Sequence, residues 1–404
     1  MGGWATIPFG KCMLKHGVTR KNQVKSSEVK TIGMHPVVDQ GQSCIAGYTD
    51  DKSKLVKDGL PYIIFGDHTR CFKYVDFPFA LGADGTKVLK PLPDSFSPRF
   101  FYYAMLSIDI PSLGYNRHFK LLKEKFVPKP PLPEQHRIAA VLSLIQRAIE
   151  QQERLIALTT ELKKALMHKL FTEGTCGEPQ KQTEIGPVPE SWDLIKLGDL
   201  AEKISKGSSP KWQGFNYVKD GILFVRSQNV GNGFMDFSDK AYLPEEFNEK
   251  ERRSVLREND ILINLVGASI GRAALATPEV EGANCNQAVC FVRMGGSSLL
   301  KNFIVYFLLS ESGQDQMRRQ KKDIARANLS LLDVKGFEIP IPKSEDEMKD
   351  IANVFITLDS IIARYEIERS SFQDLFHTLL HQLMTAEIRV NDLDLKGLGL
   401  DIEE

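Results

Sequence analysis

The chain has 404 residues, 26% of them charged and 42% hydrophobic, with 52 basic and 52 acidic side chains. This composition is globular and excludes a disordered, collagenous or disulfide-dense chain, and the length predicts more than one domain. The longest apolar runs are far shorter than the ~18 residues of a membrane helix, and the amino terminus lacks an apolar signal core. The six cysteines stand singly, without C-x-x-C spacing. We therefore expect a cytoplasmic protein without a zinc ribbon or a redox pair.

The zero net charge hides an uneven distribution. Residues 1–133 carry 19 basic and 11 acidic side chains, whereas residues 343–404 carry 6 and 14. One interpretation is that the amino-terminal part meets a polyanion, and the other is solvated surface with an acidic tail. Charge alone does not choose between them.

The sequence contains an internal repeat. The segment Ile138-Ala139-Ala140-Val141-Leu142 returns 213 residues later as Ile351-Ala352-Asn353-Val354-Phe355, and a proline-rich segment precedes each copy. Near the start, Trp4, Ile7 and Gly10 match Trp192, Ile195 and Gly198 at an offset of 188. Chance similarity of two amphipathic helices would explain the helical match, but not the prolines and tryptophans that fall in the same order. We interpret the chain as a duplication, with repeats at 4–191 and 192–404.

Two mixed domains alternate with two long helices. The expected order is a first domain over 1–130, a long helix within 131–174, a linker over 175–191, a second domain over 192–340, a second long helix within 341–386 and a tail over 387–404. Strand-like runs end at turns in 59–66, 221–225 and 260–267, and short helices are expected at 100–107 and 299–310. Each mixed domain is therefore expected to be α/β or α+β.

The long helices are predicted from uninterrupted apolar spacing. Residues 134–172 and 345–386 contain neither proline nor glycine, and Gly174 offers a C-cap to the first helix. Ser344 and Glu347 have capping-box spacing at the start of the second. Heptad tracks predict an antiparallel coiled-coil spacer with an internal pseudo-two-fold repeat, and the alternative is a pair of ordinary core helices. By the same offset the tail corresponds to the linker, so we expect it to return to the first domain near Trp4.

We find no catalytic signature in the sequence. It lacks a G-x-x-x-x-G-K-[ST] phosphate loop, a G-x-G-x-x-G fingerprint, H-E-x-x-H and G-x-S-x-G. The glycine-rich Gly267–Arg272 lacks the lysine that would reach a phosphate, so we interpret it as a turn after a strand. His168 and His381 occupy matched positions late in the long helices, where packing or dipole compensation is typical. We expect neither catalytic residues nor a metal site.

Both mixed domains carry polar and basic clusters. Arg with Asn or Gln can read base edges, whereas Lys, Ser and Thr suit phosphate contacts. For any single cluster solvated surface is the plainer interpretation, but two such domains held apart by a rigid spacer favour a DNA reader. The candidate DNA-binding residues of the first domain are Lys15, Arg20, Lys21, Lys25, His68, Thr69, Arg70, Arg117 and Lys120. Those of the second domain are Lys206, Ser208, Ser209, Lys211, Arg226, Gln228, Asn229, Ser269, Arg272, Asn286 and Gln287.

These features resemble the specificity subunit of a type I restriction–modification enzyme. The resemblance runs from Trp4 to about Glu387 and rests on three groups of residues. They are the sequence Pro130-Pro131-Leu132-Pro133-Glu134-Gln135-His136-Arg137-Ile138-Ala139, the motif Gly66–Arg70, and Gly267–Arg272 followed by Asn286-Gln287-Ala288. The start of the second helix, Pro342-Lys343-Ser344-Glu345-Asp346, departs from this pattern.

The resemblance implies two target recognition domains that each read one half of a bipartite DNA sequence with a fixed unspecified gap. The helices would act as a ruler and dock two modification subunits. Those subunits would carry S-adenosylmethionine and the adenine methyltransferase motifs, and restriction subunits, which use ATP, would join through them. This chain would itself be non-catalytic. The alternatives are the recognition part of a single-chain restriction–methylation enzyme, which the missing methyltransferase motifs oppose, and a coiled-coil adaptor that binds no nucleic acid.

Overall fold

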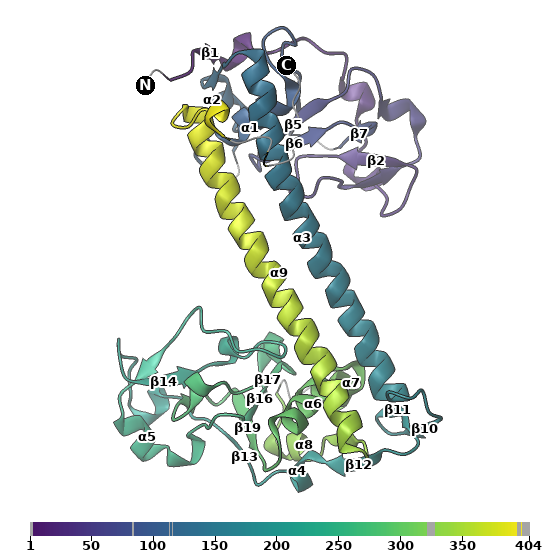
Figure 1. The fold of residues 1–404 in the computed structure, drawn as a ribbon, viewed down its shortest axis with the longest axis vertical. Coiled ribbons are helices and arrows are strands. Elements are labelled where there is room, and N and C mark those ends of the chain that lie inside the picture. Colours follow the sequence, from purple (N-terminus) through teal and green to yellow (C-terminus); the bar gives the residue numbers. More distant parts are fainter. Residues whose placement is uncertain are drawn as a thin grey trace. The chain divides into compact units, whose positions relative to one another are not determined.

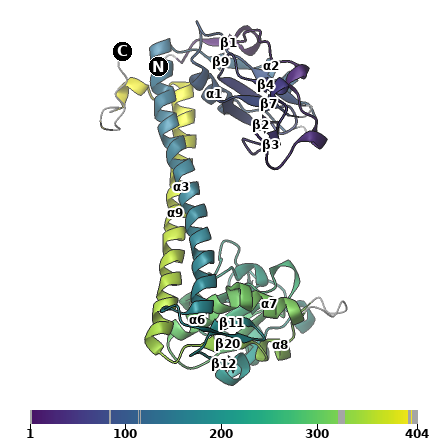
Figure 2. The same ribbon diagram turned by 90° about the vertical axis from the view of Figure 1, so that its right-hand side faces the viewer.

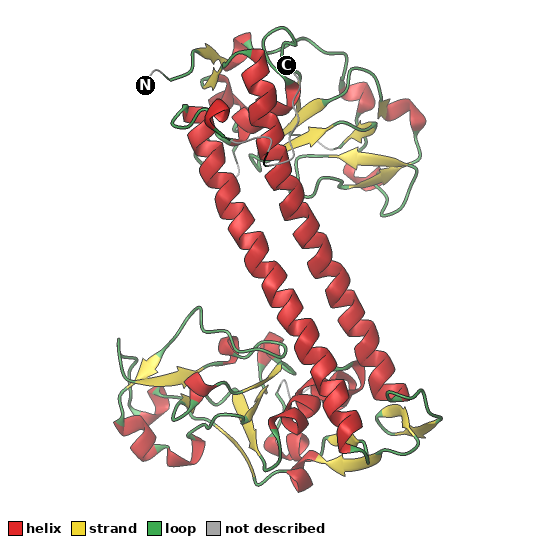
Figure 3. Ribbon diagram, viewed as in Figure 1, coloured by secondary structure: helices red, strands yellow, loops and turns green. Residues whose placement is uncertain are grey.

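The computed structural model describes residues 3–82, 85–112, 114, 116–320, 328–393 and 397. The chain divides into two compact units. Unit 1 consists of Met1–Glu153 with Ile367–Glu404, and unit 2 consists of Arg154–Glu366. Each unit mixes helices and strands (Figure 3), which confirms the predicted fold class. Both long helices cross the division, so each unit holds part of both.

Unit 1 is built on small sheets. Its strands are β1 (Thr6–Pro8), β2 (His35–Val38), β3 (Gly47–Thr49), β4 (Leu55–Val56), β5 (Tyr62–Gly66), β6 (Phe72–Val75), β7 (Phe79–Leu81), β8 (Thr86–Leu89) and β9 (Phe126–Pro128). They form sheets in the orders β3-β2-β7-β4, β6-β5-β8 and β1-β9. The helices are α1 (Pro98–Leu106), α2 (Phe119–Lys123) and the adjoining parts of α3 (Leu132–Glu173) and α9 (Glu345–Thr385). Every residue of β5 is buried, which explains its unbroken apolar sequence.

Unit 2 holds the remaining strands. These are β10 (Gln180–Thr183), β11 (Gly186–Pro189), β12 (Asp193–Lys196), β13 (Lys203–Lys206), β14 (Ile222–Val225), β15 (Tyr242–Leu243), β16 (Ile261–Asn264), β17 (Ala273–Leu275), β18 (Asn284–Cys285), β19 (Val289–Arg293) and β20 (Glu338–Ile341). The sheet orders are β13-β19-β16-β17, β15-β14-β18, β12-β20 and β10-β11. Its shorter helices are α4 (Leu197–Leu200), α5 (Glu246–Lys250), α6 (Ser298–Leu309), α7 (Glu311–Gln320) and α8 (Leu331–Lys335).

The internal repeat is visible in the strand pairing. In unit 1, β1 pairs antiparallel with β9, so that Ile7 lies opposite Val127. In unit 2, β12 pairs antiparallel with β20, so that Ile195 lies opposite Ile339. In both cases a strand near the start of the repeat pairs with the strand that directly precedes a long helix. The duplication therefore includes a long-range contact and not only the helices.

Within each unit, one part of α3 packs antiparallel against one part of α9 (Figures 1 and 2). In unit 1 the first turns of α3 share a core with the last turns of α9, and Gln152 donates a hydrogen bond to Glu368 at 3.1 Å. In unit 2 the Phe171 ring stacks on Phe355 with centroids 5.9 Å apart. Among the described residues, no helix combines the length and the apolar character that a membrane span requires.

The ends of the long helices differ in detail from the sequence-based prediction. Gly174 has φ 66° and its N–H reaches the Leu170 carbonyl, which confirms the glycine cap. The helix α3 starts at Leu132 and includes Pro133, because proline is tolerated in a first turn. At α9, Ser344 caps the Glu347 N–H, but the Glu347 carboxylate accepts hydrogen bonds from Thr175 and Trp192. That carboxylate fastens the start of the second repeat to α9.

The segment after α9 packs within unit 1. Val390 is buried in the core, and Arg389 pairs with Glu134 at 3.0 Å while its guanidinium lies 3.9 Å from the Trp4 ring centroid. The Trp4 indole donates to the Leu383 carbonyl at 3.0 Å. Of the tail, residues 394–396 and 398–404 lie outside the described residues. Residues 387–393 thus pack against the amino-terminal segment around Trp4.

Candidate nucleic-acid interface

Four polar loops of unit 2 meet at one edge of its sheets. The strands β14 and β18 are parallel, with Val225 opposite Cys285, so the residues that follow both strands emerge side by side. Asn264 lies opposite Val289, and Lys206 lies opposite Cys290, which brings the ends of β16 and β13 to the same place. We call the four loops the strand-end cluster. It comprises residues 206–209, 226–229, 267–272 and 286–287.

Backbone bonds lock these loops to one another. The Ser208 N–H donates to the Cys285 carbonyl at 3.2 Å. A Cβ on Gly207 would lie 1.6 Å from that same carbonyl oxygen, so glycine is required there. The buried Asn264 donates from Nδ2 to the Ser227 carbonyl at 2.7 Å and thereby holds the loop after β14. Sequence reasoning missed Asn264, although a polar residue that ends the run Ile261-Leu262-Ile263 was the signal.

The side chains of this cluster differ in how freely they can meet a ligand. Asn229 is only 3% exposed, accepts from the Arg226 N–H and donates to two backbone carbonyls, so it shapes its loop. Arg226 and Gln228 both contact the Asp239 carboxylate, at 3.1 and 2.6 Å. The exposed Lys206 and Arg272 of the cluster, and the exposed Lys211 just beyond it, present cations directly to solvent. The side chains of Ser208, Ser209, Ser269, Asn286 and Gln287 are half-buried.

In unit 1 the turn after β5 is tied to three other segments. Gly66 pairs with Thr86, and the buried Asp67 accepts the Phe119 N–H at 2.7 Å and lies 3.7 Å from the Lys87 ammonium. Gln40 accepts the His68 N–H through Oε1 and the Thr69 hydroxyl through its carbonyl. Gln40 follows β2 and was not singled out in the sequence, because only the fold places it beside this turn.

The predicted Thr69 and Arg70 side chains of this turn are bonded to other segments of unit 1. The Thr69 hydroxyl bonds to Gln40, and Arg70, at φ 62°, donates from Nη1 to the Ile110 carbonyl at 2.8 Å. Arg70 is nevertheless exposed overall. These bonds position the turn, so a contact of Arg70 with a ligand would use its remaining guanidinium donors.

The helix α2 forms one wall of a cationic cleft beside this turn. The cleft has a volume of about 800 Å³, and its walls include Lys15, Phe119 and Lys123. The ammonium groups of Lys87 and Lys123 lie 5.7 and 5.1 Å from the Phe119 ring centroid. The exposed Arg117 and Lys120 lie next to the segment His118-Phe119 in the sequence. Three predicted DNA-binding residues therefore lie in the same part of unit 1 as the turn at 66–70, namely Lys15, Arg117 and Lys120. The fold adds two lysines to this group that the sequence did not indicate, Lys87 and Lys123.

Three other predicted residues lie apart from this cleft. Arg20 and Lys21 form the short helix η2 (Arg20–Asn22), which is fastened to Lys54 through the Asn22 amide at 3.4 Å. Lys25 forms an ion pair with Glu28 at 3.7 Å, and both side chains are well exposed. The structure therefore separates the basic residues of the first domain into two groups.

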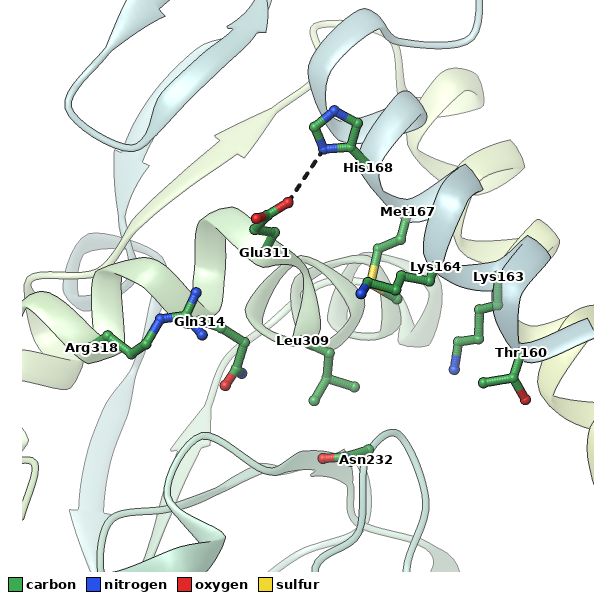
Figure 4. A pocket seen from close by; sticks show the side chains of 10 residues that line it. All are labelled: Thr160, Lys163, Lys164, Met167, His168, Asn232, Leu309, Glu311, Gln314 and Arg318. Atoms are coloured by element: carbon green, nitrogen blue, oxygen red, sulfur yellow. Dashed lines mark ion pairs between the residues drawn. The ribbon is translucent and has the colours of Figure 1, made fainter. Parts of the chain in front are cut away.

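Unit 2 also contains a pocket of about 540 Å³ between α3, α7 and the loop at Asn232 (Figure 4). Figure 4 shows Lys163, Lys164, His168 and Arg318 around it, with His168 3.7 Å from Glu311. Lys163 is neutralised by Asp359, which also accepts the Tyr306 hydroxyl. Burial and that carboxylate raise the pKa of Tyr306. Gln314 donates to the Gly271 carbonyl at 2.9 Å, so the pocket adjoins the strand-end cluster.

The described residues contain no group of three or more His, Cys, Asp or Glu side chains placed to hold a metal ion. The arrangement instead combines exposed cations with amides and hydroxyls at loop ends. These groups can contact phosphates and base edges.

The sequence comparisons agree with this chemistry. Residues 189–369 match the family described as "Type I restriction modification DNA specificity domain". This match, together with the relatives and the solved structure described next, confirms the resemblance to type I specificity subunits.

Individual relatives are named as type I specificity subunits. The chain is 27% identical to the type I restriction enzyme MjaVIII specificity subunit of Methanocaldococcus jannaschii, over 68% of this chain and 65% of that relative, slightly under two thirds of its length. It is 24% identical to the EcoR124I/EcoR124II specificity subunit of Escherichia coli, over 88% and 87% of the two chains. Among solved structures, the S subunit of a type I restriction–modification system from M. genitalium has the same fold. Its TM-score is 0.64 at 19% identity, over 94% of this chain and 96% of that chain.

Proposed function

We propose that this chain is the non-catalytic DNA-recognition subunit of a type I restriction–modification system. It recognises a bipartite sequence with a fixed unspecified gap, and unit 1 and unit 2 each read one half. One observation carries the proposal: each repeat holds its own group of loops with cationic and amide side chains. In unit 1 this group is the turn at 66–70 with the adjoining cleft, and in unit 2 it is the strand-end cluster. Two separate sites on a duplicated chain fit a two-part target.

In this proposal the exposed cations hold DNA phosphates, and the remaining polar side chains read base edges. The phosphate contacts are Lys15, Arg117, Lys120, Lys206, Lys211 and Arg272. The half-buried Arg226 and the exposed Gln228 release Asp239 and bond base edges instead. Their side chains already bond a carboxylate, so they have donors of suitable geometry.

The partners follow from the same proposal. Two methyltransferase subunits dock on α3 and α9 and bring S-adenosylmethionine, and restriction subunits that use ATP join through them. The pocket in Figure 4 lies beside α3, and its cations are partly neutralised, so we do not assign it to a cofactor.

Duplex binding by the assembled complex tests this function. The chain, purified with its methyltransferase subunits, should bind a specific duplex with an affinity that falls linearly in log–log plots against salt concentration. Methylome sequencing of a host with and without the gene should reveal a split methylated motif. By itself the chain should neither methylate nor cut DNA, and methyl transfer by the isolated chain would contradict the proposal.

A further inference from the structure

Trp212 is an exposed aromatic side chain at the rim of the strand-end cluster. It lies in the short helix η5 (Lys211–Gln213) and is 82% exposed. The other two tryptophans of the chain serve the core, since Trp192 is fully buried and Trp4 is half-buried against Arg389. Tyr217 and Val218, a few residues later, are also exposed, at 57% and 40%. This short segment of the chain thus exposes three large apolar side chains, and exposed apolar surface of this kind can mark an interaction site.

The loop that carries Trp212 is firmly braced. The Gln213 amide donates to the Ser208 hydroxyl at 3.0 Å, and the Lys250 ammonium donates to the Gln213 carbonyl at 2.9 Å. Phe215 packs edge-on against Phe247, with ring centroids 5.3 Å apart. Because Ser208 is itself bonded to Cys285, the loop is fixed to the strand-end cluster. The indole is therefore presented on a rigid support, which lowers the entropy lost when it binds.

The charge around Trp212 indicates an anionic partner. Residues 203–219 contain Lys203, Lys206, Lys211 and Lys219 and no carboxylate, and the first acidic residue after them is Asp220. A flat indole among lysines matches a nucleic acid, whose bases offer π faces and whose phosphates offer negative charge. A methyltransferase surface that docked here would have to desolvate several lysines. The observations favour DNA over a protein partner.

We propose that Trp212 is inserted as a wedge that stacks on a base step of the half-site bound by unit 2. This inference rests on the proposed function and extends it. The strand-end cluster would read base edges, while Trp212 would favour steps that unstack easily, so sequence preference would extend to a position without a hydrogen-bonded contact.

The test uses the complex with methyltransferase subunits and specific duplexes that carry 2-aminopurine at successive positions. The emission of this base rises on unstacking and is quenched by an indole stacked on it. With the natural chain, one step in one half-site should respond. Trp212→Ala should abolish that response and weaken specific binding roughly 5- to 150-fold, the usual effect of losing one base–aromatic stack. Trp212→Phe keeps a stacking ring but no indole, so it should restore most of the affinity and show the unstacked emission of that step without the indole quench.

A control variant separates stacking from general loss of exposed apolar surface. Leu332→Ala removes a side chain that is 77% exposed on α8 of the same unit and should change neither readout. Circular dichroism and thermal unfolding should be the same for all variants, because Trp212 contributes little buried surface.

Two outcomes would overturn the wedge while leaving the proposed function intact. One is specific duplex binding by Trp212→Ala with unchanged affinity and an unchanged 2-aminopurine pattern. The other is normal DNA binding per assembled complex with weaker assembly, which would make Trp212 a docking residue for the methyltransferase. Failure of the natural complex to bind any duplex specifically would instead refute the proposed function, and the wedge with it.

Discussion

Individual side chains at the candidate interface divide into those that shape loops and those that can meet DNA. Asn229 and Asn264 are buried, and their side-chain amides donate hydrogen bonds to backbone carbonyls. Arg226 and Gln228 lie on the same loop, but their partner is the mostly exposed Asp239. Residue type alone does not separate these classes, because an amide can cap a loop as well as it can read a base.

The double variant Arg226→Ala/Gln228→Ala tests half-site assignment. We expect a loss of discrimination of about 1–3 kcal/mol per lost base contact, confined to one half-site. Methylation by the complex of a library randomised in both half-sites measures this. The comparison variant Lys120→Ala in unit 1 should weaken all sequences alike and lower the salt slope by about one unit. Equal damage to both half-sites by the double variant would show that the two units do not read separate halves.

Cysteine reactivity provides a second residue-level prediction. Burial raises the pKa of Cys12 to about 11 and raises the pKa values of Cys285 and Cys290 further. At pH 8 these three thiols therefore stay protonated, and since the thiolate is the nucleophile they should resist iodoacetamide in the native protein. The exposed Cys176 should react readily. Mass spectrometry after brief alkylation, with and without denaturant, checks the pattern, and rapid native alkylation of Cys285 would contradict it.

Among the elements, α3 and α9 carry most of the architecture, because each contributes to the core of both units. In unit 1 the buried Ile138, Leu142 and Leu383 join the two helices, and in unit 2 Phe171 and Phe355 do so. The middle turns of α9, around Ile362 and Tyr365, are only half-buried. The apolar seam is thus strongest where the helices meet the mixed domains.

Phe171→Ala tests that contribution in unit 2. The Phe171 ring is 2% exposed and contacts Phe303, Phe307 and Phe355. Its removal should lower the free energy of unfolding of unit 2 by about 3–5 kcal/mol. Hydrogen exchange along β16 and β19 during urea titration measures unit 2 specifically. The matched variant Leu162→Ala, on the same helix but 50% exposed, should change stability by less than about 0.5 kcal/mol. Equal effects of the two variants would contradict this account of the seam.

The whole molecule consists of two units that are connected by two helices. The helix α3 runs from unit 1 into unit 2, and α9 runs from unit 2 back into unit 1. The division between them falls after Glu153 in α3 and after Glu366 in α9, and both positions are helical. We propose that these connections fix the gap between the two half-sites, because a continuous helix has a defined rise per residue.

Insertion of seven residues into both helices, after Gln152 and after Tyr365, tests this proposal. Each helix should lengthen by about 10 Å while the heptad seam is kept. Since base pairs rise about 3.4 Å each, the preferred gap should grow by roughly three base pairs unless DNA bending absorbs the change. Methylation of a library of sites with varied gaps measures it. An insertion in α3 alone is the control and should mainly destabilise the protein, and an unchanged gap in the active double insertion would exclude the helices as the ruler.

Features that depend on local pattern could be predicted from the amino-acid sequence. Uninterrupted apolar spacing gave α3 and α9 within a few residues, β5 and β16 followed from short apolar runs, and the offset of 213 revealed the duplication. The neighbours of each strand could not be predicted in this way, because strand pairing joins residues far apart in the chain, as Val225 and Cys285 are. That pairing brings Gln40 to the turn at 66–70 and Lys87 to Phe119, and it buries Asn229 while leaving Trp212 exposed. The exposure and partners of a polar side chain are set by such long-range contacts, which a local sequence pattern does not specify.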